Sequence, residues 1–84
     1  MSFEKITKLI FDIDDVVTIT GKRSEEIKQL VDSGKIKASG KGNDIRFTLG
    51  NISTYIEKGY SNYSSERMRA EGTLLSLYRK KRGQ

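Results

Sequence analysis

Apolar residues recur at helical spacing early in the chain, where a first short helix is predicted. Asp12 suits its N-cap, and Gly21 tolerates the left-handed conformation of a helix C-terminus. Asp14 and Asp15 fall in the first turn, where carboxylates interact favourably with the helix dipole. We therefore interpret the three aspartates as helix-capping residues rather than metal ligands. The inward-facing positions are Val16, Val17 and Ile19.

A second predicted helix follows the turn at Gly21. Ser24 is its expected N-cap and Gly34 its expected end. Its apolar stripe, spaced i, i+3, i+4, consists of Ile27, Leu30 and Val31. Two short helices joined by a tight turn that contains glycine have the layout of a helix-turn-helix.

The pattern then changes to one typical of strands. Residues 35–38 and 44–47 alternate polar and apolar side chains, and residues 39–43 between them are rich in turn formers. This pattern predicts a β-hairpin with a flexible tip. Thr48 is the expected N-cap of a third helix that ends at Gly59. The predicted inner face of that helix consists of Leu49, Ile52, Tyr55 and Ile56.

A fourth helix is predicted for residues 65–82, although Gly72 weakens it by roughly 1 kcal/mol relative to alanine. One face carries Met68, Glu71, Leu75 and Tyr78, flanked by Leu74 and Leu77. The apolar side chains have two open interpretations, a stripe of the intramolecular core or a self-association face. The self-association candidates are Met68, Leu74, Leu75, Leu77 and Tyr78.

The predicted fold is mainly α with a small β-hairpin, a winged helix-turn-helix followed by a C-terminal helix. Residues 1–10 are expected to form an arm over the core, residues 11–59 the winged helix-turn-helix domain, and residues 60–84 a linker and a basic amphipathic helix. The apolar side chains of the expected arm are Phe3, Ile6, Leu9 and Ile10.

Composition narrows the functional classes. The 84 residues have room for one domain with a small core, with 35% hydrophobic and 32% charged side chains. Cysteine and histidine are absent from the sequence, which removes thiolate metal sites and the commonest general base. We expect a protein that is not an enzyme and needs no cofactor or metal. No apolar run approaches the roughly 18 residues of a membrane span, and residues 1–5 lack a signal-peptide layout, so we expect no membrane association and a cytoplasmic location.

Positive charge is concentrated in two blocks. The net charge is +5; residues 22–46 contain seven basic and four acidic side chains, and residues 66–84 contain six basic and two acidic. Two basic blocks suit a polyanionic partner such as nucleic acid. A solvated surface with a basic helix end has the same composition, so charge alone leaves both interpretations open.

Residues 11–56 also contain a joint pattern of caps, glycines and wing residues. An acidic cap with two acidic residues and an apolar pair precedes a turn glycine, a Ser-Gly pair, a small residue that opens the hairpin, a glycine at its tip and a basic-apolar-Thr ending. The residues are Asp12, Asp14, Asp15, Val16, Val17, Gly21, Ser33, Gly34, Ala38, Gly42, Arg46, Phe47 and Thr48. This pattern resembles the excisionase-like branch of the MerR-type winged-helix family. Residues 40–45 are also similar to the wing of the small terminase subunits of lambda-like phages, which continue into oligomerising helices.

The resemblance implies that the second helix enters a DNA major groove and that the hairpin, or wing, contacts a minor groove or phosphates. Glu25 and Glu26 depart from the family pattern at the start of that helix, because carboxylates repel phosphate, although they can accept from cytosine. An ordinary solvated surface is the alternative for each set of candidates. The DNA-contact candidates are Lys22, Arg23, Ser24, Lys28 and Gln29 in the second helix, Lys41, Asn43 and Arg46 in the wing, and Arg79, Lys80, Lys81 and Arg82 near the C-terminus.

These features lead to one principal functional hypothesis. The chain is expected to be an accessory factor of a phage or mobile element, active in a bacterial cell or its nucleoid. It would bind double-stranded DNA in several copies beside an integrase, as an excisionase-like directionality or regulatory factor. One alternative is a small terminase subunit that recognises packaging DNA together with a large terminase subunit. The other is a winged-helix protein-interaction module without DNA binding, which Glu25 and Glu26 favour.

Overall fold

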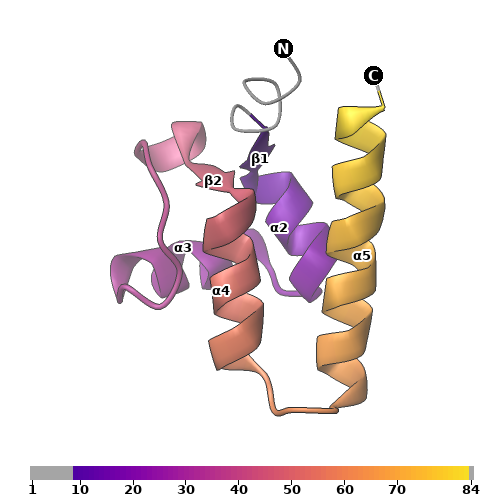
Figure 1. Cartoon of the computed structure of the whole chain (residues 1–84). Helices are drawn as coiled ribbons and strands as arrows, with labels where there is room; N and C mark the ends of the chain where they lie inside the picture. The colour runs from indigo at the N-terminus through magenta and orange to yellow at the C-terminus, as the bar shows by residue number, and fades with distance from the viewer. Residues whose placement is uncertain (1–8, 84) are drawn as a thin grey trace.

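The computed structural model describes residues 9–83, and within them four α-helices pack together with a small two-stranded sheet that lies beside α2 and α4 (Figure 1). The predicted fold class, mainly α with a small antiparallel β-element and a C-terminal helix, is confirmed and is compatible with a small winged-helix-like fold. Phe3 and Ile6 of the expected arm lie outside the described residues. The elements are β1 (Ile10–Asp12), α2 (Ile13–Thr20), α3 (Ser24–Asp32), the 3-10 turn η1 (Gly42–Asp44), β2 (Arg46–Thr48), α4 (Leu49–Gly59) and α5 (Ser65–Arg82).

The sheet pairs different segments from those of the predicted hairpin. β1 and β2 are antiparallel, with Phe11 directly opposite Phe47. Both side chains are buried and their strand neighbours are exposed, as expected of strands with one face on the core. Residues 35–38 form no strand, and on this side of β2 the pairing found among residues 9–83 is a bridge between Ser39 and Arg46. A cross-strand aromatic pair stabilises the observed pairing, and Ile10, the last residue of the expected arm, lies in a strand instead.

Two predicted helix caps are confirmed by their hydrogen bonds. Asp12 and Asp15 form a reciprocal capping box at the start of α2, in which each carboxylate accepts from the other residue's backbone N–H, at 2.9 and 3.1 Å. The hydroxyl of Thr48 accepts from the N–H of Asn51 at 3.0 Å and begins α4. The aspartates of α2 thus have a structural explanation in helix capping.

The prediction for α3 was wrong at its N-terminus and correct at its C-terminus. Ser24 is not the N-cap; Arg23 is, and the Glu26 carboxylate accepts from its N–H at 3.0 Å. Glu26 therefore takes over the capping role that a serine hydroxyl was expected to fill. At the other end, Gly34 has a φ of 82°, and the N–H of Lys35 donates to the Leu30 carbonyl at 2.9 Å. This closure, which confirms the predicted helix end, turns the chain sharply toward the wing.

The core is formed by side chains from all four helices, the sheet and the segment after α3. α5 packs against α2 and α4, whereas α3 lies at the opposite edge of the molecule (Figure 1). The largest fully buried side chains are Phe11, Val16, Ile27, Ile36, Phe47, Ile52 and Ile56. Within residues 9–83, no helix combines the length and apolarity that crossing a membrane requires.

Candidate nucleic-acid interface

The outer face of α3 is more acidic than basic. Its exposed side chains are Glu25, Glu26, Gln29 and Asp32. Among the predicted contact residues, Arg23 and Gln29 are exposed, and Lys22, Ser24 and Lys28 are half-buried. Three carboxylates on this face repel phosphate, and two of them, Glu25 and Glu26, lie in the first turn of α3, next to the two basic residues of the preceding turn. The N-terminal end of α3 therefore presents mixed charge to DNA.

The wing, residues 39–46, has the opposite character. Lys41, Asn43 and Arg46 are all exposed, as is the single wing carboxylate, Asp44. The Arg46 guanidinium donates one hydrogen bond to the Ile45 carbonyl at 3.0 Å, which leaves its other donors directed to solvent. The three predicted wing residues thus form a compact exposed set with donors suited to phosphate.

The wing backbone is a tight turn in which Gly40 approaches the backbone of Asp44 closely. Its base is the bridge between Ser39 and Arg46, with backbone hydrogen bonds of 2.9 and 2.8 Å. Gly40 has a φ of 84°, and a Cβ at this position would overlap the carbonyl oxygen of Asp44. Gly42 has a φ of 59° but has open space around it. Gly40 therefore sets the close approach that places Lys41 at the wing tip.

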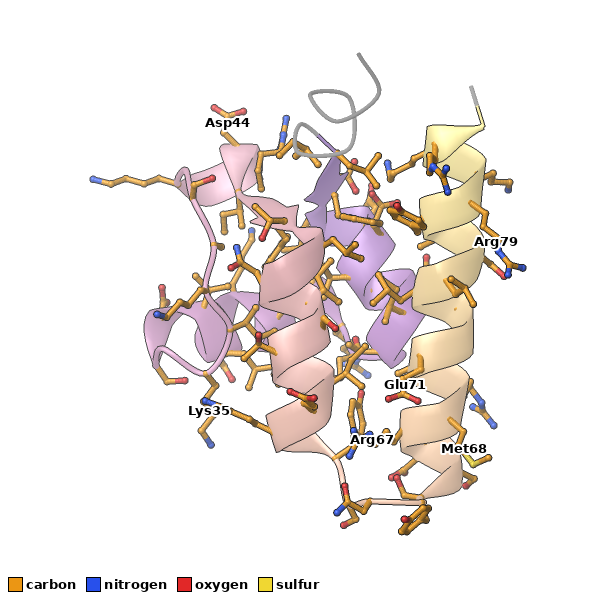
Figure 2. The ribbon with its side chains drawn as sticks, in the orientation of Figure 1. Lys35, Asp44, Arg67, Met68, Glu71 and Arg79 are labelled. Atoms are coloured by element: carbon orange, nitrogen blue, oxygen red, sulfur yellow. The ribbon has the colours of Figure 1, made fainter. Side chains whose placement is uncertain are left out.

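The basic end of α5 lies on another side of the molecule. Figure 2 shows Asp44 of the wing and Arg79 of α5 at opposite edges. Lys81 is held within the molecule, since its ammonium group forms a salt bridge with Asp15 at 3.1 Å and lies 5.4 Å from the centre of the Phe11 ring. Of the four predicted contacts in α5, Arg79, Lys80 and Arg82 are exposed, and Arg82 lies over the ring of Tyr78.

The self-association prediction for α5 requires a correction. Leu74 is buried at 7% exposure, and Leu77 and Tyr78 are partly buried against the core, because this face of α5 covers α2 and α4. These three side chains belong to the intramolecular core. Met68 and Leu75 are exposed, at 64% and 47%, and are the two predicted residues that remain free for another molecule.

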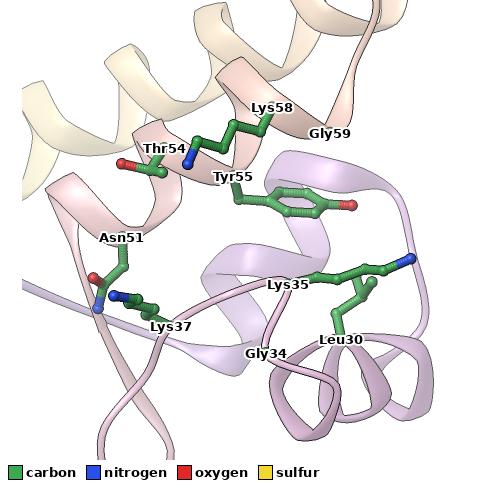
Figure 3. Close-up of a pocket in the computed structure, with 9 residues that line it drawn as sticks. All are labelled: Leu30, Gly34, Lys35, Lys37, Asn51, Thr54, Tyr55, Lys58 and Gly59. Carbon is green, nitrogen blue, oxygen red and sulfur yellow. The ribbon is translucent and has the colours of Figure 1, made fainter.

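A basic cleft opens between α3, the segment after it and α4 (Figure 3). Its volume is about 670 Å³, and its lining contains three lysines and no carboxylate. The lining residues are Leu30, Gly34, Lys35, Lys37, Asn51, Thr54, Tyr55, Lys58 and Gly59. None of these lysines was among the predicted contact residues, so the cleft adds a basic site that the pattern of the chain did not single out.

A sequence signal for the cleft existed in two places. The Lys35-Ile36-Lys37 alternation buries the isoleucine and exposes both lysines. On α4, Asn51, Thr54, Tyr55 and Lys58 are spaced i, i+3, i+4, i+7 and form one polar-edged stripe. Only the closure of α3 at Gly34 brings the two features together, and that long-range relation cannot be obtained from local spacing.

Tyr55 provides the cleft with a neutral hydroxyl. Burial raises the pKa of Tyr55 above its usual value, and Tyr60 and Glu26 add to the shift. Burial and Glu66 likewise raise the pKa of Tyr60, whose ring packs edge-on against Tyr55 at 5.9 Å. At neutral pH the Tyr55 hydroxyl is therefore protonated and able to donate a hydrogen bond.

Comparisons with known proteins leave the family open. No protein-family model matches the chain, and neither curated proteins nor solved structures give a significant match. The resemblance of residues 11–56 to excisionase-like winged helices therefore stays a prediction from the sequence.

Proposed function

We propose that this protein is a non-catalytic DNA-binding accessory factor that holds double-stranded DNA mainly through its wing. The observation that carries the proposal is the exposed wing set, Lys41, Asn43 and Arg46, on a turn built around Gly40. An ammonium and an amide near the tip of a tight turn, with a guanidinium at its base, are groups that contact phosphates and groove edges.

In the proposed arrangement most DNA contacts come from the wing, unlike in proteins that contact DNA mainly through the second helix of the helix-turn-helix. DNA approaches the side of the molecule formed by α3 and the wing, with Arg23 and the wing on phosphates. Gln29 is the exposed neutral side chain of α3 that can reach a base edge. Because most contacts go to phosphate, binding is expected to depend strongly on salt.

The experiment is a fluorescence-anisotropy titration of duplex DNA at several salt concentrations. Lys41→Ala combined with Arg46→Ala removes two charged donors, each worth about 1.5–3 kcal/mol when bonded, so we expect affinity to fall more than about 100-fold. The slope of log affinity against log salt should fall by about 1.8, since each phosphate contact contributes about 0.9.

Arg69→Ala is the control for the loss of an exposed basic side chain away from the wing. Arg69 is an exposed basic residue of α5, which lies beyond α4 from α3 (Figure 1), and its removal should leave affinity within twofold. Circular dichroism establishes that each variant is folded. A folded wild-type protein that does not bind duplexes at low salt overturns the proposal.

Among DNA-binding roles, we favour an excisionase-like directionality or regulatory factor of a mobile element over a small terminase subunit. Terminase-type assembly needs helices that oligomerise without DNA, whereas the apolar stripe of α5 around Leu74 is used inside the monomer. We expect a monomer by light scattering that forms multimers on DNA carrying several sites. A ring-sized oligomer without DNA favours the terminase role.

A second candidate function is a protein-interaction module. The exposed carboxylates of α3, Glu25, Glu26 and Asp32, favour a basic protein partner over DNA at that face. The combined variant Glu25→Gln/Glu26→Gln separates the two functions and keeps an acceptor for the α3 cap. Under the DNA proposal it should strengthen duplex binding by about 2- to 30-fold, from roughly 0.2–1 kcal/mol for each of the two exposed charges.

A further inference from the structure

The basic cleft between α3 and α4 has an unbalanced charge. Among residues 9–83 the salt bridges are Arg67–Glu71 and Lys81–Asp15, so Lys35, Lys37 and Lys58 have no acidic partner. Glu57, the neighbour of Lys58 on α4, lines the groove toward α5 on the other side of that helix. Three ammonium groups around one cleft repel one another unless an anion lies between them.

The donors gather at one end of the cleft. Figure 3 shows the ammonium groups of Lys37 and Lys58 on the side of Asn51 and Thr54, whereas Lys35 extends to the other end, beyond the Tyr55 ring. Two ammonium groups, an amide and a hydroxyl supply donors in several directions around a small volume. A tetrahedral oxyanion, which accepts hydrogen bonds on several oxygens, matches this set.

The nearby end of α3 does not oppose an anion strongly. Leu30 borders the cleft, and its carbonyl accepts from the N–H of Lys35 at 2.9 Å, the N–H of Ile36 at 3.2 Å and the Ser33 hydroxyl at 3.2 Å. The N–H of Gly34 donates to the Val31 carbonyl at 3.0 Å. The partial negative charge of this helix terminus is therefore largely compensated by its own closure.

We infer that the cleft is a phosphate-binding site, with a phosphate held between Lys37 and Lys58 and contacted by Asn51 and Thr54. This inference rests on the proposed function, and the phosphate is one of the backbone phosphates of the bound DNA. The course of the backbone supports DNA as the source of the phosphate, because the segment that begins at Gly34 runs directly from the end of α3 up to the wing (Figure 1). A DNA strand that is bound at Lys41 therefore passes along the same side of the molecule into the cleft.

The test measures the salt dependence of duplex binding for Lys37→Gln, Lys58→Gln and their combination. Each lost contact should lower the slope of log affinity against log salt by about 0.9, and the double variant by about 1.8. Lys37→Arg/Lys58→Arg keeps both charges and should keep the wild-type slope. Arg69→Gln, which removes one exposed charge of α5, should leave the slope unchanged.

A second arm distinguishes the sources of phosphate. Pyrophosphate is titrated into the isotope-labelled wild-type protein while the amide signals of Asn51, Thr54 and Lys58 are followed by NMR. Shifts at these amides that are lost in Lys37→Gln/Lys58→Gln support a phosphate site.

The outcomes separate the site from the proposed function. If the wild type binds DNA and the double Gln variant keeps its full slope, the cleft inference is overturned while wing-mediated binding stands. If the wild type does not bind DNA but pyrophosphate occupies the cleft, the DNA source is overturned and a small phosphate ligand takes its place. If neither binds, both proposals fail.

Discussion

The two basic regions of this chain use their charges differently. In residues 35–46, four basic side chains are exposed, and none of them forms a salt bridge within the described part of the chain. In α5, Arg67 pairs with Glu71 along the helix and contacts Asn62, and Lys81 pairs with Asp15 of α2. The first region directs its charge toward solvent beside a cleft, and the second uses part of its charge to hold a helix in place.

This difference shows why charge content does not by itself locate an interface. The two sequence blocks are similarly basic, and both were candidates for DNA contact. A charge can bind a partner without loss only if it is not already paired. Within the described part of the chain, all four basic side chains of residues 35–46 meet this condition, whereas two of the six in α5, Arg67 and Lys81, do not.

The largest expected effect tests whether α5 is part of the fold. Leu74→Ala removes a buried side chain and should lower the free energy of unfolding by about 2–5 kcal/mol, whereas Leu75→Ala, on the exposed side, should cost less than about 0.5 kcal/mol. Urea denaturation measures both variants. If α5 served self-association instead, the wild-type midpoint would rise with protein concentration and Leu75→Ala would abolish that rise.

A smaller effect is expected from the wing backbone. Gly40→Ala forces a side chain against the Asp44 carbonyl at a positive φ and should cost about 2–3 kcal/mol, against about 1 kcal/mol for Gly42→Ala, which meets only the φ penalty. Urea denaturation gives the stabilities, and anisotropy under folding conditions gives DNA affinity. Gly40→Ala should lose most of its affinity. Wild-type affinity in a folded, destabilised Gly40→Ala protein would show that the wing is not the main contact.

Local signals predicted the helices well, because caps and closures depend on a few neighbouring residues. Asp12, Thr48 and Gly34 act as expected, and α5 has the predicted bounds of residues 65–82. The predicted N-cap of α3 was wrong, because two residues compete for the capping interaction there. The Glu26 carboxylate reaches back to the Arg23 N–H, and Ser24 becomes the first helical residue.

Long-range relations were not predictable from local spacing. Nothing near Phe11 indicates that its strand partner is Phe47, 36 positions later, so Ile10 was assigned to an arm. The same limit hid the cleft, whose lysines come from α4 and from the segment after α3. The apolar face of α5 was also misplaced. Spacing alone allowed Met68 and Leu75 to be the inner face, whereas packing on α2 and α4 selects Ala70 and Leu74.

The smallest expected effect concerns the paired charge of α5. Lys81→Gln loses a partly exposed salt bridge to Asp15 and a cation–π contact with Phe11, which together should cost about 1 kcal/mol, or about 4–8 °C in Tm. Lys80→Gln removes the same charge from an exposed, unpaired position and should change Tm by less than about 2 °C. Thermal unfolding followed by circular dichroism measures both. Because the Lys81 charge is already used within the molecule, Lys81→Gln should also leave the salt slope of DNA binding unchanged. A slope lowered by about 0.9 in the folded variant would mean that Lys81 exchanges Asp15 for a phosphate, and the distinction between the two basic regions would then be lost.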